Sequence, residues 1–124
     1  MKIRVYYEDT DIGGVVYHSN YLNFCERARS ELFFKVGESP ILEHGHFVAK
    51  HIDANFIKSA KFADLLDVET ELLEMKNASF KLLQSVYKDG EKIFEMKITL
   101  AYLDHNGRLS KLDDDVKELL KKIL

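Results

Sequence analysis

Apolar and polar residues alternate with a period of two along much of the chain, which is the pattern of half-buried β-strands. It begins in residues 2–8, where Ile3, Val5 and Tyr7 fall on one predicted face. The second half of the chain contains four more such segments, at residues 47–57, 65–75, 79–87 and 92–103. The most regular of them places one apolar set inward, made up of Phe94, Met96, Ile98, Leu100 and Tyr102. Lys88-Asp89-Gly90 and Asp104-His105-Asn106-Gly107 predict tight turns.

A helical period replaces the alternation from about residue 19. Apolar residues recur there three or four positions apart, at Tyr21, Phe24, Cys25, Ala28, Leu32 and Val36. This stripe predicts an amphipathic helix of roughly five turns, capped by Ser19 and ended by Gly37. A second helix is predicted after Asp113-Asp114-Asp115, with its apolar stripe at Val116, Leu119, Leu120 and Ile123. Residues 9–17 contain two glycines and a polar start, which predicts a loop.

This order of elements predicts a single α+β domain over residues 1–124. One long helix lying on a curled antiparallel sheet is the simplest arrangement that buries both apolar stripes. The apolar fraction of 46% is sufficient for a hydrophobic core without disulfides or metals. An open sheet leaves an edge free to pair, so we expect an oligomer.

Charge and cysteine content exclude several classes of function. A formal net charge of −3 gives no general attraction to nucleic acid or to an anionic membrane. Cys25 is the single cysteine, which excludes an intrachain disulfide and a cysteine-rich metal site. The N-terminus lacks the apolar region of a signal peptide, and the longest apolar run, residues 100–103, is too short for a membrane span. We therefore expect a soluble, cytoplasmic protein.

The segment from Glu8 to His18 contains most of the residues that could take part in a reaction. Three acids, Glu8, Asp9 and Asp11, precede two glycines, and a helix begins a few residues later. A carboxylate close to the free N–H groups of a helix start has the minimum equipment for acyl transfer, a base or nucleophile beside oxyanion donors. Spacing alone also fits an acidic surface turn that caps the helix, which is the more common structure. A calcium loop is excluded because the required ligand positions are missing.

Other polar residues have structural explanations when taken alone. His18 is either a general acid or base or an ordinary residue near the helix start. His44 and His46 lack a third ligand at a recognisable spacing, so we expect no metal. Cys25 lies on the apolar stripe and is expected to be a buried small hydrophobe. The pair Lys58 and Lys61 is a solvated basic turn unless the ligand carries phosphates.

Three motifs together carry a resemblance to a known family. Tyr7-Glu8-Asp9-Thr10-Asp11 is followed by Gly14-Val15-Val16-Tyr17-His18-Ser19-Asn20-Tyr21 and then by Glu26-Arg27-Ala28-Arg29. This pattern resembles the 4-hydroxybenzoyl-CoA thioesterase family, within it most nearly the bacterial acyl-CoA thioesterases associated with the Tol–Pal system. The resemblance implies a hotdog fold, hydrolysis of acyl-CoA without a cofactor, and homodimers paired at sheet edges and commonly assembled into homotetramers.

The resemblance also implies roles for individual residues. The second aspartate of the family motif corresponds to Asp11, as nucleophile or as general base. The oxyanion donor corresponds to the backbone N–H of His18, whose imidazole is a second candidate participant. Substrate contacts are implied for Gly14, Val15, Tyr17, Lys58, Ser59 and Lys61. Ser59 and Ala63 stand where family members commonly have proline and glycine, and Ile12 stands where they often have a small residue.

Two other functions remain open at the level of sequence. A hotdog hydratase or dehydratase would use a histidine paired with a helical acid, so His18 and Glu26 would have to serve. A non-catalytic subunit would bind acyl thioesters or acyl carrier protein. The preferred acyl group and the choice between CoA and acyl carrier protein depend on pocket depth, which one sequence does not give.

Overall fold

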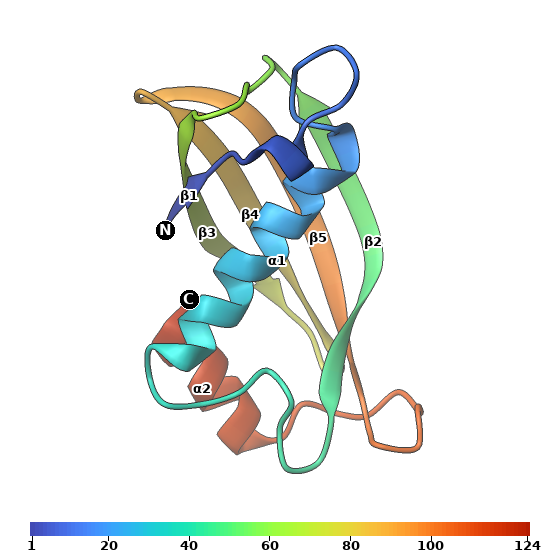
Figure 1. Ribbon diagram of the computed structural model, residues 1–124. Helices are drawn as coiled ribbons and strands as arrows, with labels where there is room; N and C mark the ends of the chain where they lie inside the picture. Colours follow the sequence, from blue (N-terminus) through green and yellow to red (C-terminus); the bar gives the residue numbers. More distant parts are fainter.

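One long helix lies across a five-stranded antiparallel sheet in the computed structural model, which describes residues 1–124 (Figure 1). The chain begins with strand β1 (Lys2–Arg4), a 3₁₀ turn at Tyr7–Asp9 and helix α1 (His18–Phe34). The remaining strands are β2 (His46–Phe56), β3 (Leu65–Met75), β4 (Ser79–Lys88) and β5 (Glu91–Leu103). Helix α2 (Asp114–Ile123) ends the chain. The predicted α+β class is confirmed, and the four predicted later strands agree with β2 to β5 within one residue at each end.

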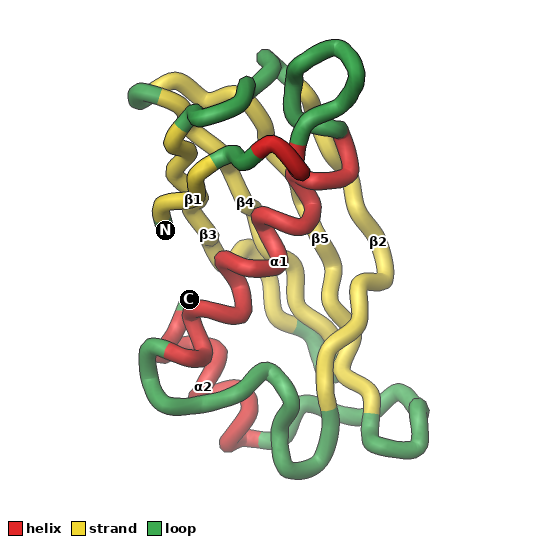
Figure 2. The backbone as a smooth tube through the Cα atoms, in the orientation of Figure 1, coloured by secondary structure: helices red, strands yellow, loops and turns green.

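The strands follow the spatial order β1-β3-β4-β5-β2, and all neighbours are antiparallel. The sheet curls around α1, and α2 lies near the C-terminal end of that helix (Figures 1 and 2). This is the hotdog arrangement that the resemblance implied. The two sheet edges are unequal, because β1 has three residues and β2 has eleven.

The core forms between α1 and the concave face of the sheet. All five predicted inward residues of β5 are buried, with exposed fractions between 0% and 6%. Phe24, Cys25 and Ala28 of α1 pack into the same cluster. Helix α2 adds Val116 and Leu120, and the Asp113 carboxylate caps that helix by accepting from the Val116 N–H at 2.9 Å. The predicted second helix and its acidic start are confirmed.

The β4–β5 hairpin turns at Asp89 and Gly90, as predicted. Their φ angles of 50° and 80° are both left-handed, which matches the twist of a two-residue hairpin and suits an Asp-Gly pair. The turn at residues 104–107 is also present, but it leads only to an isolated bridge between Leu103 and Leu109.

Three details of the sequence prediction are wrong. The first strand ends at Arg4 rather than residue 8, since residues 7–9 form a 3₁₀ turn and Tyr7 is 84% exposed. Helix α1 begins at His18 with Tyr17 as its N-cap, so Ser19 is inside the helix and caps nothing. Val36 lies beyond the helix end and is exposed, whereas Phe33, which the predicted stripe did not include, is buried.

Candidate active site

Asp9 joins the loop before α1 to the start of that helix. Its side chain is 5% exposed, and Oδ2 accepts a hydrogen bond from the Tyr6 N–H at 2.9 Å. Its carbonyl oxygen accepts from the Tyr17 N–H at 2.9 Å and from the Asn20 side-chain amide at 2.9 Å. Asp9 is therefore occupied with folding the loop, and its hydrogen bond to the Tyr6 N–H holds the 3₁₀ turn that follows β1.

Asp11 begins a tight turn that returns at Val15. The Asp11 N–H donates to the Val15 carbonyl at 2.8 Å, and the Gly14 N–H donates to the Asp11 carbonyl at 3.0 Å. Gly14 has a φ of 79°, a left-handed conformation that explains a glycine here. The carboxylate oxygen Oδ1 accepts from the Gly13 N–H at 2.8 Å and from the Val15 N–H at 3.4 Å. These bonds fix the carboxylate through one oxygen and leave Oδ2 without a partner in the protein.

The first turn of α1 supplies hydrogen-bond donors beside this carboxylate. His18 is the first helical residue, and Tyr17 offers no side-chain cap. The His18 N–H has no acceptor within the protein, as expected for the uncapped first turn of a helix. The imidazole is exposed and lies against two aromatic rings, with centroid separations of 4.4 Å from Tyr17 and 6.4 Å from Phe56.

A cleft of about 290 Å³ brings Asp11 and His18 together with the segment that follows β2. Its other lining residues are Val15, Val16, Tyr21, Phe56, Ile57, Lys58 and Ser59. Tyr21 holds one wall in place, because its buried hydroxyl accepts from the Ala60 N–H at 3.0 Å. Burial raises the pKa of Tyr21 above its ordinary value, so the hydroxyl keeps its proton at neutral pH.

Lys58 and Asp11 are the charged residues that line the cleft, with opposite charges. The Lys58 ammonium pairs with Glu91 at 2.7 Å on the surface. Its backbone is fixed by the Ile93 carbonyl, which accepts from the Lys58 N–H at 3.1 Å. The cleft thus combines a carboxylate, a free backbone donor and one positive charge, which suits attack on a carbonyl in a ligand that carries anionic groups.

The structure brings together some of the predicted site residues and separates others. Asp11, Val15, His18, Lys58 and Ser59 line one cleft. Gly14, Tyr17 and Lys61 do not line this cleft. Gly14 shapes the turn and Tyr17 is exposed beside His18. The backbone of Lys61 forms an isolated β-bridge with Val15. Val16, Tyr21, Phe56 and Ile57 were missed by sequence reasoning, because their apolar character identified them only as parts of strands or of the helical stripe.

The remaining reactive side chains are placed elsewhere. Cys25 is fully buried, and burial raises its pKa to about 12, so its thiol is not a nucleophile at neutral pH. No three His, Cys, Asp or Glu side chains are grouped in a way that would hold a metal ion. None of the helices combines the length and apolar character that a membrane crossing requires.

Comparison with curated proteins identifies relatives of the chain. It is 48% identical over 87 residues to the acyl-CoA thioesterase YbgC of Helicobacter pylori, covering 70% of this chain and 65% of that protein. The chain thus spans just under two thirds of that relative's length. It is 40% identical over 106 residues to the YbgC of Haemophilus influenzae, covering 82% of this chain and 78% of that protein.

Solved structures agree with the sequence comparison. The probable thioesterase of Bartonella henselae superposes with a TM-score of 0.86 at 30% identity, covering 91% of this chain and 97% of that one. A hypothetical protein of Aquifex aeolicus has the same fold, with a TM-score of 0.91 at 24% identity and 97% of each chain covered. The sequence profile described as the thioesterase-like superfamily matches residues 5–120. The chain therefore belongs to the thioesterase-like superfamily.

Proposed function

We propose that this protein hydrolyses acyl-CoA thioesters to a carboxylic acid and CoA, with Asp11 as the catalytic carboxylate. The observation that carries the proposal is the hydrogen bonding of Asp11. One carboxylate oxygen is fixed by backbone N–H groups, and the other is free at a cleft that opens beside an uncapped helix start. The names of the relatives support the same reaction class.

The proposed reaction uses the cleft residues in complementary roles. The free oxygen of Asp11 either attacks the thioester carbonyl or removes a proton from the attacking water. In both cases negative charge develops on the carbonyl oxygen, where the unpaired His18 N–H and the positive end of the α1 dipole stabilise it. The C–S bond then breaks, and the CoA thiolate leaves and takes a proton. General-base catalysis releases the carboxylic acid at this point, whereas nucleophilic attack leaves the acyl group on Asp11 as a mixed anhydride, which a water molecule then hydrolyses to the acid and free Asp11. Turnover in H₂¹⁸O tests the nucleophilic role, since hydrolysis of the anhydride at the Asp11 carboxyl carbon puts ¹⁸O into Asp11, whereas a general base stays unlabelled.

The CoA moiety is proposed to bind on the segment that contains Lys58 and Ser59. The Lys58 ammonium is 62% exposed at the cleft edge, where it can meet a phosphate without being desolvated. Gly14, Tyr17 and Lys61, which the resemblance also implies as contacts, lie outside the lining and would reach only parts of the substrate that extend beyond the cleft.

The test of the function is thiol release across a panel of short-chain, long-chain and aromatic acyl-CoA thioesters, with acyl carrier protein thioesters beside them. We expect hydrolysis of at least one CoA thioester, and a loss of 10²-fold or more in kcat for Asp11→Asn with folding retained. Hydration of an enoyl-CoA without thiol release would favour the hydratase that uses His18 and Glu26. Tight binding without turnover of any thioester would favour the non-catalytic acyl-binding subunit.

A homodimer formed through β2 is part of the same proposal. This strand is the long free edge of the sheet, and its side chains Ile52 and Phe56 are 38% and 55% exposed. Antiparallel pairing of two β2 edges would join two sheets and cover those side chains, and two such dimers would make the tetramer. Sedimentation at assay concentration should give a multiple of the 14.4 kDa chain mass, and a single 14.4 kDa species would refute the pairing. We also propose a cytoplasmic location and, from the family resemblance, an association with the Tol–Pal system.

A further inference from the structure

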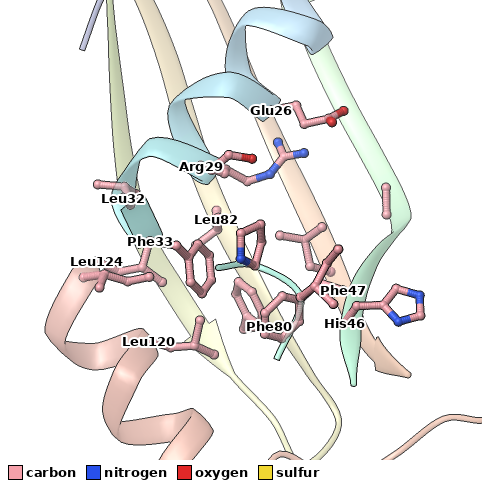
Figure 3. A pocket seen from close by; sticks show the side chains of 16 residues that line it. Glu26, Arg29, Leu32, Phe33, His46, Phe47, Phe80, Leu82, Leu120 and Leu124 are labelled. Carbon is pink, nitrogen blue, oxygen red and sulfur yellow. The ribbon is translucent and has the colours of Figure 1, made fainter. Parts of the chain in front are cut away.

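A second cavity lies at the other end of α1, between that helix, the sheet and α2 (Figure 3). Its volume is about 330 Å³, and eleven of its sixteen lining residues are hydrophobic, with Phe33, Phe47, Phe80 and Leu82 around its centre. No residue lines both this cavity and the catalytic cleft. Arg29, on the wall of the cavity, lies roughly 16 Å along the helix axis from His18, from the rise per residue.

Arg29 places a positive charge at this apolar cavity without forming an ion pair. Its Nη1 donates to the Gln84 side-chain oxygen at 2.8 Å, and it forms no ion pair. The Gln84 amide nitrogen is already committed to the Cys25 carbonyl at 2.9 Å and the Thr70 hydroxyl at 3.0 Å. The guanidinium is thus held in position by a neutral amide, and four of its five N–H groups remain for another acceptor.

The Arg29 guanidinium is unusual because it is a charged group that has lost part of its contact with solvent. Desolvation lowers the pKa of Arg29 from its ordinary value, yet an arginine keeps its charge at neutral pH. A partly desolvated guanidinium without an ion pair costs folding free energy, and an anion that enters the cavity would offset that cost. Glu26, one turn earlier, also lines the cavity, and its negative charge raises the pKa of Arg29, but its side chain is exposed and it forms no ion pair with the guanidinium.

We propose that this cavity binds a small carboxylic acid, with the carboxylate on Arg29 and the hydrocarbon part among the apolar side chains. A guanidinium presents paired N–H groups that match the two oxygens of a carboxylate. One such group beside mainly hydrophobic walls suits a monoanion with an apolar body rather than a polyphosphate. The volume falls at the lower end of the roughly 300–1,000 Å³ of small-molecule pockets, which fits a medium alkyl chain or one aromatic ring. The proposed hydrolysis would release acids of this class, but the inference rests on the cavity and not on that activity.

The test compares octanoate with octanamide, its neutral isostere, in calorimetric titrations of the wild-type protein. Octanoate should bind at least 10-fold more tightly, because its two charged oxygens can form a bidentate ion pair with the guanidinium, whereas octanamide offers one neutral oxygen. Arg29→Met should remove the difference between the two ligands. Ser30→Leu, which retains Arg29 and fills part of the cavity, should weaken both ligands together and serves if Arg29→Met does not fold.

Three results would overturn the proposal. Equal affinity for octanoate and octanamide would show that Arg29 does not recognise the carboxylate. Absence of binding by either ligand would show that the cavity does not accept this class. Displacement of octanoate by free CoA would place the acid in the catalytic cleft rather than in the second cavity. None of these results depends on turnover, so they leave the proposed hydrolysis to its own test.

Discussion

The hydroxyl of Tyr21 should stabilise the fold and position one wall of the catalytic cleft. Tyr21→Phe removes the acceptor of the backbone N–H of Ala60, a residue that is 0% exposed. The ring itself keeps its stacking on Phe94, at a centroid distance of 5.0 Å, so little apolar contact is lost. The predicted cost is that of leaving one buried N–H unpaired, about 1–3 kcal/mol.

The assay for Tyr21→Phe is urea unfolding followed by circular dichroism, with the midpoint and the slope fitted separately. The midpoint should fall while the slope stays constant, because the surface exposed on unfolding hardly changes. The matched control is Tyr17→Phe, whose side chain is 46% exposed and whose hydroxyl has no partner; it should change stability by less than about 0.5 kcal/mol. Equal stability of the two variants would refute the role of the buried hydroxyl. Thiol release by Tyr21→Phe should show a raised KM, since Ser59 and Lys58 lie on the wall that Ala60 anchors.

Three further predictions follow from single contacts. Gly45→Ala would place its Cβ against the Leu103 carbonyl oxygen and the Tyr102 ring, so the melting temperature should fall by several degrees. An unchanged melting temperature would contradict the close approach. Burial opposes ionisation of the Asp64 carboxyl, but hydrogen bonds from a backbone N–H and a lysine outweigh burial and lower the pKa of Asp64 in the folded state. The stability gained from this lower pKa is present above the pKa of the unfolded state and is lost as the pH falls through the pKa of the folded state. Asp64→Asn should therefore be less stable than wild type at pH 7 and equally stable near pH 2. Glu91→Gln frees Lys58 from its 2.7 Å ion pair and should lower KM for acyl-CoA up to about fivefold at constant kcat, an effect that added salt should diminish.

Sequence periodicity predicted the scaffold well because the same pattern that identifies each element also buries it. The inward set of β5 and the stripe of α1 face each other across one core, so local pattern and tertiary packing agree. The prediction failed where the burial of a side chain is the opposite of what its polarity suggests. Asp9 is acidic yet buried, and its hydrogen bond to the Tyr6 N–H turns the chain out of β1. Val36 is apolar yet exposed, because the helix ends before it.

The sequence predicted only the part of the candidate site that comes from one continuous segment. Asp11 and His18 share a loop and a helix start, so their proximity follows from the sequence alone. The opposite wall comes from residues 56–59, some forty positions later, and spacing could not place Lys58 in the cleft and Lys61 outside it. The cavity at Arg29 is assembled from α1, β2, β4, β5 and α2, and no local pattern marks it.

The central claim is that Asp11, among the three acids of its loop, carries the reaction. The most direct measurement is kcat for thiol release by Asp11→Asn beside Glu8→Gln, two size-preserving amide substitutions three residues apart. Glu8 is exposed and outside the cleft, so Glu8→Gln should keep the wild-type rate, whereas Asp11→Asn should lose 10²-fold or more with an unchanged unfolding midpoint. Turnover by Asp11→Asn at the rate of Glu8→Gln would contradict the mechanism.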